Sequence, residues 1–187
     1  GVHYGIRGQT ARADSHFTRA EAAGRTHLDS DDPLMAWLWQ DWAAVSLFAG
    51  DTDRAETFVG RALAIREARF PDGHPALQES RALHAAVLIE RGQFVEAERL
   101  LRDALVAIDA QHLVAGSVPA FRAELGAALA GQGRDAEAEP LLRDNLDRLR
   151  RRLTDWHGWP QHMARHVVAF YAARGRPGAA GAARALL

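Results

Sequence analysis

Cysteine and lysine are both absent from this chain of 187 residues. Without cysteine, disulfide bridges, thiolate metal sites and cysteine nucleophiles are excluded, which agrees with the cytoplasmic location that we expect. All 23 basic residues are arginine, and 24 acidic residues balance them, so the net charge is only −1. A chain this close to neutral has no overall field that would attract nucleic acid or a membrane surface.

Long apolar runs are missing as well. No stretch approaches the ~20 apolar residues that a membrane-spanning helix requires, so we expect no contact with a membrane. Apolar and polar residues do not alternate in the manner of strands, which predicts an all-α fold. The sequence also lacks an initial methionine and a secretory signal, and we expect it to be part of a larger protein.

Motifs that carry catalysis are not found either. The chain has no Gly-x-Ser-x-Gly, no His-Glu-x-x-His, no kinase catalytic loop and no Walker lysine. We therefore expect no enzymatic activity, no catalytic residues and no cofactor.

What the sequence does contain is a repeat. A glycine followed five residues later by alanine occurs five times, at steps of 42, 42, 41 and 42 residues. This period predicts a stacked array of small helical repeats. The five pairs are Gly8/Ala13, Gly50/Ala55, Gly92/Ala97, Gly133/Ala138 and Gly175/Ala180. The repeats of this single array are expected at 1–33 (with a truncated first helix), 34–75, 76–117, 118–159 and 160–187.

Each repeat is predicted to hold two helices joined at the glycine. In the third repeat, apolar residues at three- and four-residue spacing predict helices at about 77–91 and 95–110. Glycine ends the first helix because a left-handed backbone conformation costs it almost nothing. The alanine lies where the two helices approach closely, so a larger side chain would separate them. The last helix, at 177–187, contains two glycines and is expected to be weak.

Two helix starts in the second repeat can also be predicted. Asp32 followed by Pro33 is typical of a helix N-terminus, because aspartate accepts hydrogen bonds from free amides and proline fits the first turn. Asp53, with Glu56 three residues later, has the spacing of a capping pair, so we expect Asp53 to begin the next helix.

Several segments share a known pattern. The Gly/Ala/Ala triplets, RALAIRE at 61–67, GHP at 73–75 and AEPLLRDNL at 138–146 resemble the tetratricopeptide repeat in its 42-residue, kinesin-light-chain-like variety. Trp39 falls at that family's tryptophan position in the first helix of a repeat, the A helix. The resemblance implies a right-handed superhelical solenoid of antiparallel helix-turn-helix repeats, whose A helices line a concave groove.

The resemblance also implies a function. Such arrays are scaffolds that bind a protein or peptide segment in the groove, and in bacteria they are often attached to kinases, regulatory ATPases or transcription regulators. The alternative is a regulatory or oligomerisation domain of a larger signalling protein, which would contact its own chain or a twin subunit.

The spacing of the A helices places a set of small and apolar side chains toward the expected groove. We expect a partner segment to be buried against them, with Trp37 as an aromatic anchor and with Glu79 and Arg165 orienting it. The alternative is that the alanines only allow neighbouring hairpins to pack tightly. The residues expected to contact a partner are Trp37, Gln40, Ala44, Leu47, Glu79, Ala82, Ala86, Ile89, Ala123, Ala127, His162 and Arg165.

Three tryptophans lie close together in WLWQDW at 37–42. At about 100° per residue, Trp39 and Trp42 share one face of a helix, which we expect to pack in the core. Trp37 points away from that pair and toward the expected groove, unless the neighbouring hairpin covers it.

Two histidines, His162 and His166, lie one helical turn apart, a spacing that can bind zinc on one face of a helix. A third ligand would have to come from His157 or Asp155 in the preceding loop, and no acidic residue lies between the two histidines. We therefore expect a structural role for them and no metal. The basic cluster at 148–152 is expected to be a solvated helix end, so nucleic acid is not an expected partner.

Overall fold

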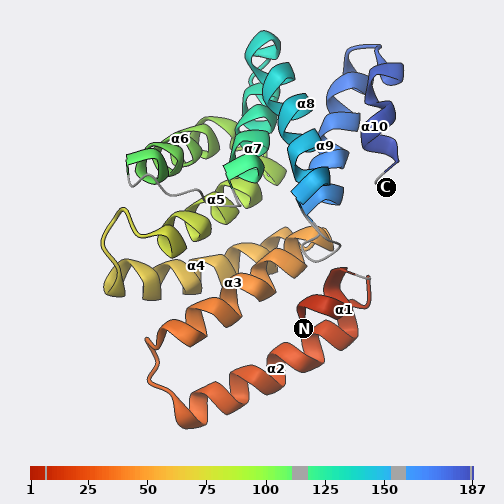
Figure 1. The fold of residues 1–187 in the computed structure, drawn as a ribbon. Helices are drawn as coiled ribbons and strands as arrows, with labels where there is room; N and C mark the ends of the chain where they lie inside the picture. The colour runs from red at the N-terminus through yellow and green to blue at the C-terminus, as the bar shows by residue number, and fades with distance from the viewer. Residues whose placement is uncertain (7, 111–117, 153–158, 186) are drawn as a thin grey trace. The chain divides into compact units, whose positions relative to one another are not determined.

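The computed structural model describes residues 1–6, 8–110, 118–152, 159–185 and 187 (Figure 1). These residues form helices and no strand, so the predicted all-α fold is confirmed. The helices are α1 (Val2–Ile6), α2 (Thr10–His27), α3 (Pro33–Phe48), α4 (Thr52–Arg69), α5 (Pro75–Glu90), α6 (Phe94–Ala110), α7 (Val118–Gly131), α8 (Asp135–Arg152), α9 (Trp159–Ala173), the 3-10 turn η1 (Pro177–Ala180) and α10 (Gly181–Arg184). None of these helices is long and apolar enough to cross a membrane.

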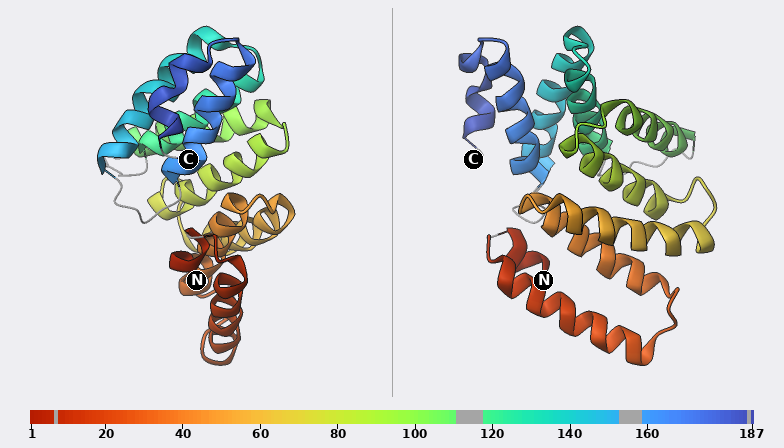
Figure 2. Two further views of the ribbon diagram at one scale, coloured as in Figure 1. Left: turned by 90° about the vertical axis from the view of Figure 1, so that its right-hand side faces the viewer. Right: turned by 180° about the vertical axis from the view of Figure 1, so that it is seen from behind.

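The chain forms two compact units. The first unit is Gly1–Val87 and the second unit is Leu88–Leu187, with the boundary inside α5. In the first unit α3 packs along α4, and in the second α7 packs along α8. The α3–α4 hairpin can be followed in Figure 1 and, from behind, in Figure 2, where its helices are orange and gold.

The five repeat glycines end their helices as predicted. Their φ angles are 69°, 85°, 74°, 75° and 65° in chain order, all in the left-handed region. The residue after each glycine donates its backbone N–H to the carbonyl five residues earlier, at 2.8–3.0 Å, which is the bond that defines a Schellman motif. A Cβ on any of the five would meet no heavy atom within 4 Å. The backbone conformation, rather than a lack of space, therefore requires glycine here.

The paired alanines are completely buried, as expected for residues that pack between helices. Ala13, Ala55, Ala97, Ala138 and Ala180 are all 0 % exposed. The weak final helix is confirmed too, because among the described residues after α9 only η1 and the four residues of α10 are helical.

One of the two predicted helix starts is correct. The Asp32 side chain accepts a hydrogen bond from the Leu34 amide at 2.8 Å, and Pro33 occupies the first turn of α3. The second expectation was wrong, since Asp51 caps α4 by accepting from the amide of Arg54 at 3.2 Å and Asp53 lies within the first turn. The tight turn at Gly50 explains the shift, because only one residue separates this glycine from the start of the helix.

Four stacked aromatic rings fill the interior of the first unit. Trp39 and Trp42 are each 5 % exposed and their ring centroids lie 5.9 Å apart, which confirms the prediction that both are core residues. Phe58 of α4 stacks on Trp42 with a centroid distance of 4.3 Å, and Phe17 of α2 stacks on Trp42 at 5.3 Å. These rings join α2, α3 and α4 into one core.

An ion pair recurs between consecutive repeats of the second unit. Glu98, six residues after Gly92, binds Arg134 with an Oε1–Nη1 distance of 2.7 Å. Glu139, six residues after Gly133, binds Arg176 with an Oε2–Nη1 distance of 3.0 Å. In both pairs the arginine directly follows the glycine of the next repeat. The repeat spacing therefore specifies a charge contact as well as a turn.

Candidate functional site

Helix α3 carries an exposed stripe that contains two large apolar side chains. Leu34 is 62 % exposed and Trp37, one turn later, is 47 % exposed. Asp41 continues the stripe as an exposed residue on the next turn. Leu34 also borders an apolar hollow between α2 and α3 that includes Leu28 and Met35. Large apolar groups grouped on one exposed helix face are characteristic of an interaction surface.

The indole of Trp37 rests on a buried charge. The guanidinium carbon of Arg66, on α4, lies 4.6 Å from the centroid of the Trp37 ring. Arg66 itself is 0 % exposed. A guanidinium at this distance from an aromatic face attracts the ring electrostatically and fixes its orientation. One part of Trp37 is therefore exposed to solvent, while its ring packs against the guanidinium of Arg66.

Arg66 is held by polar groups from two neighbouring helices, α3 and α5. Its Nη1 donates to Oγ of Ser80 at 2.7 Å and also to Oε1 of Gln40 and the carbonyl of Ala76. Ser80 in turn donates to Gln40 Oε1 at 2.8 Å. In the described part of the chain, Nε and Nη2 of Arg66 have no hydrogen-bond partner. Two N–H donors of Arg66 therefore make no hydrogen bond to the described residues, although the guanidinium packs against the exposed ring of Trp37.

Burial shifts the pKa values of the ionisable groups in this cluster. Burial lowers the pKa of Arg66, with the carboxylates of Glu79 and Asp41 acting in the opposite direction. Burial raises the pKa of Glu79, while the positive charge of Arg66 and a hydrogen bond from Gln40 lower it. The cluster therefore combines hydrogen-bond donors, hydrogen-bond acceptors and an aromatic surface.

The structure divides the predicted groove residues into two groups. Seven are at most 7 % exposed, so in this structure they pack inside the protein and present almost no surface to a partner. These seven are Leu47, Ala82, Ala86, Ile89, Ala123, Ala127 and His162. Five keep exposed or half-buried side chains, namely Trp37, Gln40, Ala44, Glu79 and Arg165. Arg165 is exposed, and its Nη2 lies 3.2 Å from Nδ1 of His162.

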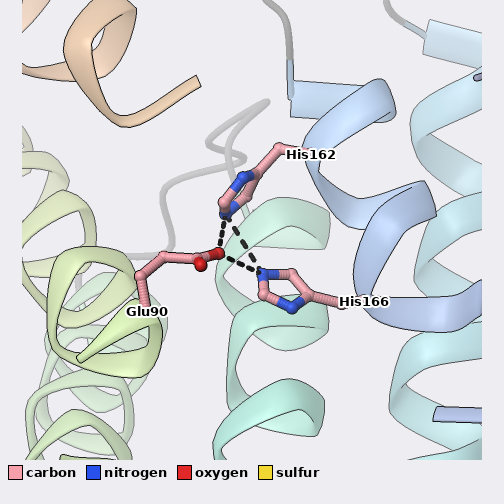
Figure 3. A group of neighbouring side chains, drawn as sticks. All are labelled: Glu90, His162 and His166. Carbon is pink, nitrogen blue, oxygen red and sulfur yellow. Dashed lines mark hydrogen bonds and ion pairs between the residues drawn. The ribbon is translucent and has the colours of Figure 1, made fainter. Parts of the chain in front are cut away.

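A second cluster of polar groups lies in the second unit. His162 and His166 of α9 direct their Nε2 atoms toward the carboxylate of Glu90, at the end of α5 (Figure 3). The two Nε2 atoms are 3.2 Å apart. Glu124 of α7 joins them, with Oε1 at 3.3 Å from His162 Nε2. His157 and Asp155, the loop ligands considered from sequence, lie outside the described residues.

Burial sets the protonation of this cluster. Burial lowers the pKa of His162 and of His166 to about 4, against the opposing effect of the nearby glutamates. Burial raises the pKa of Glu124 to about 7, with the charge of Glu90 adding to the effect and that of His166 opposing it. Both imidazoles are therefore neutral at pH 7, which is the form that binds metal ions.

Three important residues were missed in the sequence. Leu34 could have been found, because it lies one helical turn before Trp37. Glu124 had a weaker signal, as the single acidic residue of α7. Glu90 had none, since its role depends on which helices meet in space.

The comparisons with known proteins agree with this architecture. Residues 121–154 match the family described as tetratricopeptide repeat. The fold of the chain is that of an array of tetratricopeptide repeats (a TPR array). Repeats of this family generally serve as scaffolds for protein–protein interaction and are typically non-enzymatic. No curated protein sequence matches this TPR array significantly.

Solved structures resemble the whole TPR array. One is a single-residue variant of the nearly identical TPR-like repeats of a Podosopora anserina protein assigned as a kinesin light chain, with a TM-score of 0.65, 24% identity, and coverage of 98% of this chain and 89% of that chain. The same repeats without that change give a TM-score of 0.64 at 24% identity, covering 98% and 88%. BtubC (BKLC) from P. vanneervenii gives 0.60 at 19% identity, covering 97% and 78%. At these identities the likeness shows the fold alone.

Proposed function

We propose that this TPR array is a protein-interaction module whose first unit binds a partner segment on the exposed stripe of α3, with Trp37 as the anchor. The observation that carries the proposal is the state of Trp37, which is 47 % exposed while its ring rests on Arg66. Tryptophan is enriched among the residues that dominate binding energy at interfaces. An aromatic ring that is already held in place loses little conformational freedom on binding.

The surroundings of Trp37 favour a partner segment of mixed character. Leu34 extends the apolar surface by one helical turn, so an apolar side chain of the partner would be removed from water against both residues. Gln40 and Glu79 lie beside the Arg66 cluster and offer polar groups that would orient the partner backbone. The buried alanines on α5 and α7 act as packing residues, and the predicted direct contact with them is not part of this proposal.

The test compares Trp37→Ala with Val106→Ala, which removes another exposed apolar side chain, on α6. Partners captured by the wild-type chain would be identified by mass spectrometry, and their affinities measured by calorimetry. We expect Trp37→Ala to weaken binding by about 30-fold, as for a hot-spot residue, and Val106→Ala to leave it unchanged. Equal binding by both variants would contradict the proposal.

Light scattering distinguishes the alternative function. A dimer of the purified chain that persists in Trp37→Ala would favour the oligomerisation domain over the interaction module. The surface that forms the dimer would then not depend on Trp37. A monomer that binds its partner only with Trp37 present would favour the interaction module.

A further inference from the structure

We propose that Glu90, Glu124, His162 and His166 bind a divalent transition-metal ion, with Zn²⁺ as the best fit. The ion would connect the end of α5 with α7 and α9 in the second unit. This proposal goes beyond the protein-binding function and does not depend on it, since the residues of the two sites are different.

Three of the donor groups already lie together, because the ligand atoms of Glu90, His162 and His166 are all within 4.8 Å of one another, and Glu124 lies beside them. Zinc–ligand bonds of about 2.0–2.2 Å place neighbouring donors of a tetrahedron about 3.3–3.6 Å apart. The two imidazole Nε2 atoms are 3.2 Å apart. Glu124 Oε1 lies 3.3 Å from Nε2 of His162, and Glu90 Oε1 lies 3.5 Å from Nε2 of His166. The remaining histidine–glutamate pairs are at 3.9 Å, so the carboxylate of Glu124 would have to move toward the other three groups to become the fourth ligand.

The chemistry of the donors selects the class of metal. Two neutral imidazoles with two carboxylates form a ligand set that zinc accepts readily. Calcium and magnesium prefer oxygen ligands throughout and bind more of them than this site offers. Two carboxylates also balance the charge of a divalent cation, which matters because the side chains of Glu124 and His162 are each only 1 % exposed.

Glu124 provides the second, independent observation. Its side chain is buried, and within the described residues neither of its carboxylate oxygens has a hydrogen-bond partner. A buried carboxyl group without a hydrogen bond is unfavourable, and native proteins rarely keep one unless it binds a cation or acts in a site. Both oxygens instead point toward the histidines, at 3.3 Å from His162 and 3.9 Å from His166. A metal ion between them would satisfy this carboxylate.

Arg165 must move when the metal binds. Its Nη2 lies 3.2 Å from Nδ1 of His162. A neutral imidazole that binds metal through Nε2 keeps its proton on Nδ1, so it cannot accept a hydrogen bond there. Arg165 is exposed and can turn toward solvent. Arg165→Gln therefore removes a positive charge without removing a ligand, which makes it a matched control on the same helix.

The experiment uses the full chain, treated with EDTA and then freed of the chelator. Zn²⁺ is titrated by calorimetry and by thermal unfolding, with Mg²⁺ as the comparison cation. We expect one Zn²⁺ per chain, a rise in Tm with Zn²⁺ and none with Mg²⁺. Glu90→Gln and His166→Gln should each weaken Zn²⁺ binding by more than about 10-fold, whereas Arg165→Gln should bind at least as tightly as the wild type.

Two further measurements keep the test decisive. Circular dichroism without metal shows whether each variant folds, and Glu90→Gln is the safest change because the Glu90 side chain is 36 % exposed. Co²⁺ should give the strong visible absorption of a tetrahedral site in the wild type but not in His166→Gln. Zn²⁺ binding that is equally tight in folded Glu90→Gln and His166→Gln would place the ion elsewhere and overturn the proposal. Absence of Zn²⁺ binding to the wild type would overturn it as well.

Discussion

Asp14 on α2 and Arg54 on α4 form a two-pronged ion pair across the first unit. Arg54 Nη2 lies 2.7 Å from Oδ1 of Asp14, and Nη1 lies 3.0 Å from Oδ2. The indole Nε1 of Trp42, on α3, donates to the same Oδ1 at 2.8 Å. A single carboxylate thereby links three consecutive helices and satisfies the polar atom of a core tryptophan.

Replacing Asp14 by asparagine should destabilise the protein by about 1 kcal/mol. The amide keeps the shape of the carboxylate but loses its charge, and only one of its two terminal atoms can accept a hydrogen bond. The loss stays modest because the Asp14 and Arg54 side chains are 34% and 41% exposed, so solvent screens the pair. Urea unfolding measures the change, and Asp109→Asn, at an exposed position of α6, serves as the control. Equal stability of Asp14→Asn and wild type would show that the pair contributes nothing.

The contribution of Asp14 to the stability of the folded protein should disappear at acidic pH. Hydrogen bonding to Arg54 holds the pKa of the Asp14 carboxyl below its usual value. A group whose pKa is lower in the folded state stabilises the protein above its unfolded pKa, near 4 for aspartate, and loses this effect as the pH falls through its folded pKa. The stability difference between wild type and Asp14→Asn should therefore be full at about pH 7 and shrink below about pH 4. A difference that stays constant across that range would assign it to packing instead of charge.

Two glycine-to-alanine substitutions should change the stability of the protein in opposite directions. Gly92 has φ of 74°, a conformation that costs an alanine about 1–2 kcal/mol, so Gly92→Ala should destabilise the protein. Gly60 lies inside α4, and a methyl group added there would enter open space, since no heavy atom lies within 4 Å of the Cβ position. Gly60→Ala should stabilise the protein by about 0.5–1 kcal/mol through its higher helix propensity. Thermal unfolding of both variants checks the pair, and a Gly92→Ala variant as stable as the wild type would contradict the argument from φ.

The fold was predictable because its strongest signals are local. Gly50 and Gly92 end helices through their own backbone conformation, and the buried Ala55 and Ala97 follow them at a fixed spacing. Helical geometry separated Trp39 from Trp37, because residues two apart in a helix differ by about 200° in direction, but whether a neighbouring hairpin covers Trp37 was left open by the sequence.

The site residues were harder to predict because they depend on packing between repeats. Ala86 and Ala123 were expected to line a groove, yet both are completely buried, at 0 % exposure. The acidic partners of His162 come from α5 and α7, so no search near His162 in the sequence could have found them. The expectation of no metal rested on that local search. The repeat period of the sequence shows which residues share one face of a helix. It does not show which side chains from three different helices come into contact.

The recurring pair of Glu98 with Arg134 and Glu139 with Arg176 has a consequence for how such a chain can grow. The fourth repeat supplies the acid Glu139 for the repeat that follows it and the arginine Arg134 for the repeat before it. A tandem gene duplication that copied one such segment would copy both halves of the contact together. The newly created junction would then be joined by the same ion pair as the old ones, so the array can lengthen by whole repeats without inventing a new interface.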